Sequence, residues 1–202
     1  MTPPCCNGIV HFNHYSDEGA LLAAAVVNAR IDSPADVARL AAEHDVLLER
    51  PPTAEDAAGL RRWRTALAGV VDAPTVGERI EALNRLLARG TSHPRISLHN
   101  GPPHVHFRPD DVPPERQFAA ITAFGLAWFL TQRGLHRLAR CAADDCTIAF
   151  ADVTRNGRQR YCSTRCANRQ AVRRHRARPG STSPAGGPHL RPAPAASGTA
   201  GE

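Results

Sequence analysis

Four of the six cysteines in this 202-residue sequence lie in two close pairs that suit a metal ion. These four residues are Cys141, Cys146, Cys162 and Cys166. Two close cysteine pairs separated by a stretch like the one from Cys146 to Cys162 are typical of a four-cysteine zinc site, because each pair offers two thiolates from one turn. All four ligands would come from the protein, which leaves no position for a catalytic water. We therefore expect one structural Zn2+.

The residues around these cysteines predict the small fold that would position them. Residues 148–153 have the pattern of a strand, Asn156-Gly157 is a hairpin-turn signal, and residues 158–161 return toward the second pair. Ser163 is placed to cap a helix whose first turn contains Cys166. A knuckle, a hairpin and a helix of this kind together predict a treble-clef-like zinc finger.

This module has little apolar surface of its own. The best candidates for its core are Ile148, Phe150, Tyr161 and Val172. Structural zinc contributes on the order of 10–16 kcal/mol in such peptides, so the metal decides between the folded and the unfolded state.

Positive charge is concentrated in the same part of the chain. All 25 basic residues are arginine, which indicates a compositional bias and makes their total number weak evidence. Their distribution is stronger evidence, because residues 153–202 contain 10 arginines and one glutamate, a net charge of +9. Such an excess attracts a phosphate backbone, and guanidinium groups can also read guanine edges. The expected nucleic-acid contacts are Arg155, Asn156, Arg158, Arg160, Arg165, Asn168, Arg169, Arg173, Arg174 and Arg176.

Four of these arginines are predicted to share one helix face, at positions i, i+4, i+8 and i+11: Arg165, Arg169, Arg173 and Arg176. No acid lies between Asp152 and Glu202 to neutralise them. Asp152 itself is expected to be structural, as a pairing partner of Arg158 or Arg160 in the hairpin.

Upstream of the cysteines the sequence predicts a helical domain. The expected helices span residues 19–30, 35–49, 54–71, 76–90 and 114–132, with start signals at Ser33-Pro34, Thr53 and Thr75. Apolar residues recur at helical spacing, which predicts a packed core: Leu60, Trp63, Leu67 and Val70, then Ile80, Leu83, Leu86 and Leu87.

The hydrophobic period changes to that of strands before the last of these helices. Residues 95–99 and 104–108 flank a Gly/Pro turn and predict a β-hairpin. His104 and His106 should face the same side, but no carboxylate or cysteine is placed to complete a metal site there. The adjacent Cys5 and Cys6 lack partner ligands too, and we interpret them as incidental thiols.

The expected fold class is mainly α with a small β-hairpin (α+β). A helical domain should span residues 1–136, the zinc finger 137–178, and a disordered tail rich in Pro, Gly, Ala and Ser 179–202. No apolar run approaches the ~20 residues of a membrane span, and the N-terminal residues lack a signal-peptide pattern. We therefore expect a cytoplasmic protein without membrane contact, where paired cysteines favour a metal over disulfides.

The cysteine segment resembles the CGNR zinc finger, which in its family follows a mostly helical domain called ABATE. The matching positions are Cys141 and Cys146, Phe150 and Asp152, Arg155-Asn156, Tyr161-Cys162, and Cys166-Ala167-Asn168-Arg169. Ala167 departs from the family glycine, and Tyr161 stands where tryptophan is common. The family is regarded as stress-related transcription regulators, so the resemblance implies a regulator with a ligand-sensing N-terminal domain and a small-molecule effector.

We therefore expect a DNA-binding transcriptional regulator rather than an enzyme. No GxGxxG, P-loop, HExxH or GxSxG motif occurs in the sequence. Three alternatives stay open: an RNA-binding protein that uses the same basic finger, a zinc-stapled protein-interaction scaffold, and an enzyme with a pocket in the helical domain. DNA is favoured over RNA as the partner. The Leu and Val faces of the helices can pack internally or across a homodimer, so the oligomeric state is open.

Overall fold

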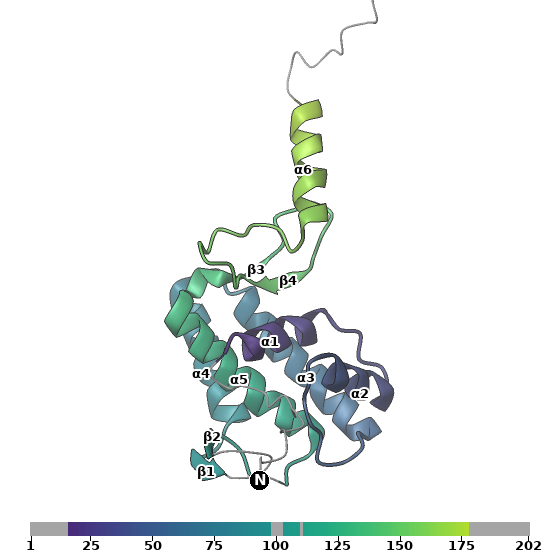
Figure 1. Ribbon diagram of the computed structural model, residues 1–202, viewed down its shortest axis with the longest axis vertical. Helices are drawn as coiled ribbons and strands as arrows, with labels where there is room; N and C mark the ends of the chain where they lie inside the picture. The colour runs from purple at the N-terminus through teal and green to yellow at the C-terminus, as the bar shows by residue number, and fades with distance from the viewer. Residues whose placement is uncertain (1–15, 98–102, 110, 178–202) are drawn as a thin grey trace, which may run out of the picture.

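The computed structural model describes residues 16–97, 103–109 and 111–177. Within these residues a body of five helices carries a small finger, from which a sixth helix stands out (Figure 1). The helices are α1 Glu18–Asn28, α2 Pro34–Glu43, α3 Ala54–Val71, α4 Val76–Gly90, α5 Pro114–Arg133 and α6 Thr164–Arg176. The predicted fold class, mainly α with small β elements, is confirmed. We call α1–α5 the helical body and residues 137–177 the finger.

The predicted helix starts of α3 and α4 coincide with closed capping boxes. Thr75 Oγ1 accepts from the backbone N–H of Glu78 at 3.2 Å, and the Glu78 carboxylate accepts from the Thr75 N–H at 3.1 Å. Thr53 and Asp56 make the same reciprocal pair at the start of α3. Each box satisfies amide donors that a first helical turn leaves unpaired, which explains why both starts could be read locally.

The predicted extent of α2 is wrong. The helix ends at Glu43, six residues before the expected end at 49. Asp45 has a φ of 53°, in the left-handed region, and the N–H of Val46 then donates to the Ala41 carbonyl at 2.8 Å. This reversal buries the Val46 side chain in the core of the helical body. Burial of an apolar side chain thus outweighs continuation of the helix.

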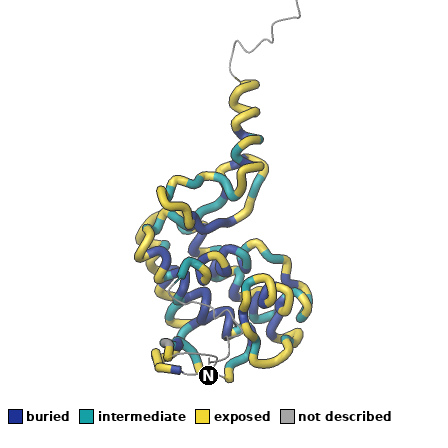
Figure 2. Tube along the Cα trace, viewed as in Figure 1, coloured by how far each residue is buried: buried dark blue, intermediate teal, exposed yellow. Residues whose placement is uncertain are grey.

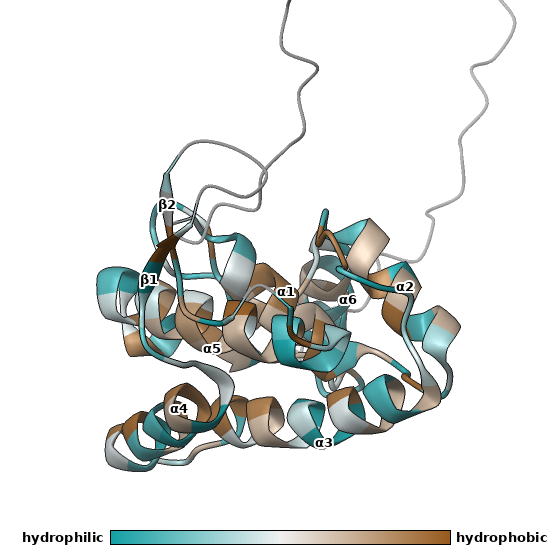
Figure 3. Ribbon diagram, turned by 90° about the horizontal axis from the view of Figure 1, so that it is seen from below, coloured by the Kyte–Doolittle hydropathy of each residue, from teal (hydrophilic) through white to brown (hydrophobic). Residues whose placement is uncertain are grey.

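The core lies where α5 packs against α1, α3 and α4, and Figure 3 shows α3 and α4 forming one layer against α5 and α1. The predicted stripe of Leu60, Trp63, Leu67 and Val70 is buried throughout. The indole N–H of Trp63 donates to Thr122 Oγ1 at 2.8 Å, which satisfies both polar groups inside the core. In the second stripe Leu83 and Leu86 are buried, whereas Ile80 is 43% exposed, contrary to expectation.

The first strand pair is the predicted hairpin. β1, Arg95–Ser97, pairs antiparallel with β2, His104–His106, with Ile96 opposite Val105. The expected turn between them lies outside the described residues. This hairpin lies at the end of the helical body opposite α6 (Figure 1).

The second strand pair differs from the prediction. β4, Ala149–Ala151, pairs antiparallel with β3, Leu138–Arg140, which follows a short 3-10 turn at Leu135–Arg137. The expected partner, residues 158–161, forms no strand. The first cysteine pair therefore lies at the tip of the β3–β4 hairpin, rather than before a hairpin. We call this tip, residues 141–146, the knuckle.

The base of the finger is built into the helical body. Leu138, Ala149 and Ala151 are buried in the same core as the helices. The side-chain amide of Asn28, at the end of α1, donates to the Ala149 carbonyl and accepts from the Ala149 N–H, both at 2.8 Å. Asn28 thus pairs with the free edge of β4 as a neighbouring strand would.

One ion pair and one hydrogen bond from the helix ends hold the same hairpin. Arg140 on β3 forms a two-point contact with the Asp72 carboxylate, at 2.8 and 2.9 Å. Arg79 on α4 donates to the Leu138 carbonyl at 2.9 Å. The body therefore fixes β3 and β4, and with them the position of the knuckle.

No helix among the described residues is long and apolar enough to cross a membrane.

Candidate metal centre and basic helix

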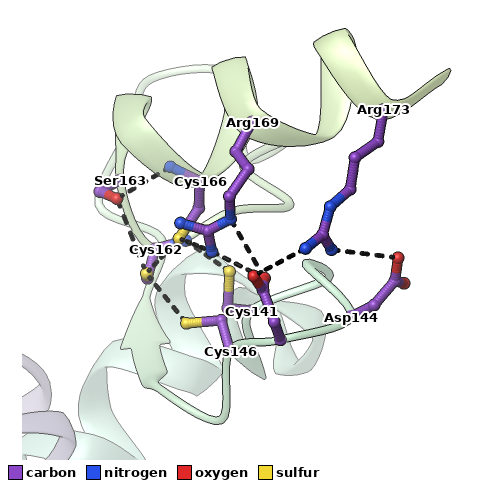
Figure 4. A network of polar contacts seen from close by, with 9 residues as sticks. Cys141, Asp144, Cys146, Cys162, Ser163, Cys166, Arg169 and Arg173 are labelled. Carbon is purple, nitrogen blue, oxygen red and sulfur yellow. Dashed lines mark hydrogen bonds and ion pairs between the residues drawn. The ribbon is translucent and has the colours of Figure 1, made fainter. Parts of the chain in front are cut away.

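The four predicted cysteines lie together in space. Their Sγ atoms all lie within 4.8 Å of one another, and Figure 4 shows the two pairs facing each other. Cys141 and Cys146 come from the knuckle, Cys162 lies just before α6, and Cys166 lies in the first turn of α6. Among the described residues this is the one group of three or more His, Cys, Asp or Glu side chains placed to hold a metal ion.

The spacing of the sulfurs fits a tetrahedral metal ion. Cys162 Sγ lies 3.7 Å from Cys146 Sγ and 3.7 Å from Cys166 Sγ. A tetrahedron with Zn–S bonds of about 2.3 Å has sulfur–sulfur edges of about 3.8 Å. A disulfide would instead require a sulfur separation of about 2.05 Å. The four residues therefore form a metal-binding cluster.

Local backbone structure positions each cysteine. The Cys141 N–H donates to the Ile148 carbonyl at 2.8 Å, and the Cys146 N–H donates to the Ala143 carbonyl at 3.0 Å, which closes the knuckle. Ser163 caps α6, since its Oγ accepts from the Cys166 N–H at 3.3 Å. The cap directs the first turn of α6 toward the knuckle.

The thiol pKa values show that the four sulfurs compete for negative charge. Hydrogen bonding to Ser163 is the largest cause that lowers the pKa of Cys166 to about 7, whereas burial raises the pKa of Cys162 to about 12. Thiolates in contact repel one another, so all four can be ionised only around a cation. The Cys162 N–H, which donates to Cys141 Sγ at 3.3 Å, offers further stabilisation to negative sulfur.

Two acids in the knuckle, Asp144 and Asp145, pair with α6. Figure 4 shows Asp144 beside Arg173. Arg169 donates to Asp145 Oδ1 through Nη2 at 2.8 Å and through Nε at 3.1 Å. Its Nη2 also lies 3.4 Å from Cys166 Sγ. Arg173 donates to Asp145 Oδ2 at 3.0 Å and lies 3.9 Å from Asp144. Burial alone would raise the pKa of Asp145, but the hydrogen bonds and charge of Arg169 lower it.

The sequence did not predict that these acids would lie beside the basic helix, because the charge pattern was taken only from the residues after Asp152. The fold brings them from upstream, because the knuckle that holds the metal also faces α6. A local signal did exist: the two acids lie between the first two cysteines, Cys141 and Cys146, and any metal bound by both pairs must bring them beside the helix.

The expected pairing of Asp152 with Arg158 or Arg160 is wrong. Asp152 is 2% exposed, and its carboxylate accepts from the Thr154 N–H at 2.9 Å, from the Thr154 hydroxyl, and from the Gln159 N–H at 2.8 Å. Burial would raise its pKa, but these hydrogen bonds lower it. Asp152 is structural as expected, yet it holds a backbone turn rather than an arginine.

This turn surrounds Asn156-Gly157, as predicted, with Gly157 at a φ of 63°. Arg137 lies beneath it and donates to the carbonyls of Asp152 at 3.0 Å and Thr154 at 2.6 Å. The returning chain then reaches the knuckle through the Ala142 N–H, which donates to the Arg160 carbonyl at 2.8 Å. Main-chain and side-chain hydrogen bonds replace the expected strand ladder.

Replacing Asp152 by alanine is expected to loosen this turn. Hydrogen bonds to a charged acceptor contribute about 1.5–3 kcal/mol each, so amide exchange at Gln159 should accelerate roughly 10- to 100-fold. Asp144→Ala is a matched control, because its carboxylate is 81% exposed and only loosely paired. Hydrogen exchange followed by NMR measures both. Equal exchange at Gln159 in the wild type and the Asp152 variant would contradict this role.

The expected core of the finger is only partly correct. Phe150 is buried and Tyr161 packs against the cysteines, but Ile148 is 41% and Val172 49% exposed. The buried residues of this small cluster are Cys141, Ala143 and Cys166. So small an apolar cluster agrees with a module whose fold depends on metal ligation.

The structure places the predicted nucleic-acid contacts in two environments. Arg169, Arg173 and Arg174 have partners within the finger, since Arg174 donates to the Tyr161 hydroxyl at 2.8 Å. Within the described residues, five others make no side-chain hydrogen bond or ion pair and are exposed: Arg155, Arg158, Arg160, Arg165 and Arg176. Asn168 is also exposed, and Asn156 Oδ1 stays in its own turn, accepting from the Arg158 N–H at 3.3 Å.

Comparisons with known proteins agree with this arrangement. The model of the ABATE family, described as "Putative stress-induced transcription regulator", matches residues 20–149. The model of the CGNR zinc finger matches residues 137–179. The two matches share residues 137–149, which contain β3 and the knuckle. Among curated proteins, none matches the chain. The ABATE model matches more than half of the chain, so the chain belongs to the ABATE family, and it carries a CGNR zinc finger.

Proposed function

We propose that this protein is a DNA-binding transcriptional regulator whose finger is held by one Zn2+. The zinc ligands are Cys141, Cys146, Cys162 and Cys166, whose sulfur–sulfur separations fit the edges of a tetrahedron of Zn–S bonds. With four protein ligands, the ion's role is to stabilise the fold. The family description supports the regulatory role, and the proposal contains no catalytic step.

One observation carries the nucleic-acid part of the proposal. Five exposed arginines of the finger lack an acidic partner among the described residues. Ten acids of the described residues already pair with other arginines: Asp17, Asp32, Asp36, Glu43, Glu49, Asp56, Asp72, Glu81, Asp144 and Asp145. Unpaired arginines grouped on one module attract a polyanion. Each phosphate that such a surface neutralises releases condensed counterions, which favours binding at low salt.

The test compares two triple variants with the same change of charge. Arg155→Ala/Arg158→Ala/Arg160→Ala removes three arginines from the finger, and Arg62→Ala/Arg85→Ala/Arg89→Ala removes three exposed arginines from α3 and α4. We expect the finger variant to bind duplex DNA roughly 10- to 100-fold more weakly at 150 mM salt, with the slope of log K against log salt reduced by up to about 2.7. Fluorescence anisotropy across a salt series measures both quantities.

The body variant should bind within about twofold of the wild type. Equal affinities of the finger variant and the wild type would show that these arginines are not the contact surface. Tighter binding to single-stranded or duplex RNA than to duplex DNA would replace the DNA proposal with the RNA alternative.

A further inference from the structure

The two sides of α6 differ in charge and in what they contact. We propose that the face formed by Arg165, Asn168 and Val172, the reading face, enters the major groove of duplex DNA and recognises base edges. Arg169 and Arg173 instead position the helix through the knuckle acids. This inference rests on the proposed DNA binding and adds which surface distinguishes one DNA sequence from another.

The exposure of α6 makes it available for such contact. Along its 13 residues only Cys166 and Gln170 are buried. The helix stands away from the helical body, and its far turns are exposed on every side (Figures 1 and 2). A helix of this length extends about 20 Å, which spans roughly six base pairs, and its diameter of about 10–12 Å fits a major groove about 12 Å wide.

The knuckle acids exclude one side of α6 from a polyanion. Asp145 lies between Arg169 and Arg173 and neutralises much of their charge. Asp144, beside Arg173, has a side chain that is 81% exposed, so it would face any phosphate that approached from this side. Nucleic acid is therefore expected to meet α6 from another side.

The neighbouring part of the α6 surface, which borders the row of Arg169 and Arg173, carries side chains suited to base edges. Asn168 is two residues from each buried residue, Cys166 and Gln170, and so projects about 160–200° away from them. Arg165 and Val172 lie three residues before and four residues after Asn168, on the same face. Val172 is 49% exposed, so about half of this apolar side chain is free to contact a partner.

These three side-chain types match the groups that the major groove displays. Arginine pairs with the O6 and N7 atoms of guanine, asparagine pairs with N6 and N7 of adenine, and an apolar side chain contacts the thymine methyl group. Within a 13-residue helix they recur at one-turn intervals, close enough for consecutive base pairs.

The same finger is poorly suited to RNA. The major groove of an A-form duplex is too narrow for side chains to read, and single strands are bound largely by stacking on aromatic rings. The only Phe, Tyr or Trp residues in the described finger are Phe150, which is buried, and Tyr161, which packs against the cysteines. Duplex DNA is therefore the partner to which we commit.

The experiment uses the full-length, zinc-loaded protein. Selection from a random duplex library first defines a preferred site, and the affinity ratio between that site and a scrambled duplex is then measured for each variant. We expect Asn168→Ala and Arg165→Ala each to lower this ratio about tenfold, the effect of losing one two-point base contact. Arg62→Ala on α3 controls for the loss of one arginine.

Variants of the positioning residues should behave differently. Arg169→Ala is expected to weaken binding to both duplexes equally, with faster loss of zinc to a chromogenic chelator, whereas Arg169→Lys should restore zinc retention in part. Asp145→Asn should retain the affinity ratio and bind both duplexes more tightly, because it removes a negative charge and frees two arginines.

Three outcomes would overturn the inference. The first is an unchanged ratio in both Asn168→Ala and Arg165→Ala. The second is a lower affinity ratio in Arg169→Ala protein that retains its zinc, because base recognition would then belong to the side of α6 that carries Arg169. The third is wild-type protein that binds duplex DNA without any sequence preference, a result that leaves the proposed DNA binding intact. Wild-type protein that binds no duplex would instead refute the proposed function itself.

Discussion

Removing the metal with a chelator is expected to unfold the knuckle and residues 152–177, while β3, β4 and the helical body stay folded. Around the cysteines, the buried residues of the apolar cluster are Cys141, Ala143 and Cys166, and two of these three are ligands. Structural zinc contributes about 10–16 kcal/mol in comparable modules, far more than so small a cluster can supply. Without zinc, the two cysteine pairs lose the ion that bonds them to each other.

The unfolding caused by metal removal should stop at the base of the finger. Leu138, Ala149 and Ala151 belong to the core of the helical body, and Asn28 holds β4 by two hydrogen bonds. Amide exchange should therefore become fast at α6 after chelation and remain slow in α3 and α5. Hydrogen exchange with mass spectrometry resolves these segments, and metal analysis gives the zinc content before and after treatment.

Cysteine variants provide the control. Cys166→Ser should lose stoichiometric zinc and reproduce the exchange pattern of the chelated protein. Cys5→Ser/Cys6→Ser removes two thiols that lie outside the described residues and should retain one zinc per chain. Protein that carries no stoichiometric metal, or a chelated protein with α6 still protected, would contradict the role of zinc.

Replacing Gly125 by valine is expected to destabilise the helical body by about 3 kcal/mol or more, at the upper end of overpacking effects. A Cβ atom on Gly125 would lie 2.6 Å from the Cα of Gly19, and one on Gly19 would lie 2.7 Å from the Cα of Gly125. Both neighbours are backbone atoms, so no side chain can rotate away, and α1 and α5 must separate. Since α5 packs against three other helices, that separation disturbs the whole core.

Alanine substitutions at Gly125 and at Gly69 in α3 provide a matched comparison. A Cβ there meets nothing within 4 Å, so Gly69→Ala should stabilise the protein by about 0.5–1 kcal/mol through the better helix propensity of alanine. Gly125→Ala should instead destabilise it. Urea unfolding of the zinc-loaded protein followed by circular dichroism compares them. Stabilisation by both substitutions would show that α1 and α5 do not cross closely at this point.

Features with local causes were predictable from the sequence. The starts of α3 and α4 were correct, because a capping box closes within four residues and depends on no other part of the chain. The cysteine cluster was correct because a metal site with two close ligand pairs has a narrow range of spacings. Most of the buried positions followed from helical periodicity alone.

The errors concern contacts between distant residues. β4 pairs with β3 rather than with residues 158–161, because the knuckle turn and the Asn28 amide together fix that edge of the hairpin. Asp152 could have paired with a nearby arginine, but the folded turn encloses it and presents amide N–H groups instead. The local sequence pattern indicates neither the strand that pairs with β4 nor the hydrogen-bond partners of Asp152.

What the sequence by itself determined was the set of elements and the ligands: helices, a four-cysteine cluster and an excess of arginine in one module. Only the tertiary structure decided which arginines are already paired, because Asp144 and Asp145 meet α6 through the knuckle. Charge in a sequence adds up along the chain, whereas electrostatic energy depends on separation in space. The side of α6 that can meet a polyanion therefore follows from the fold and not from the composition.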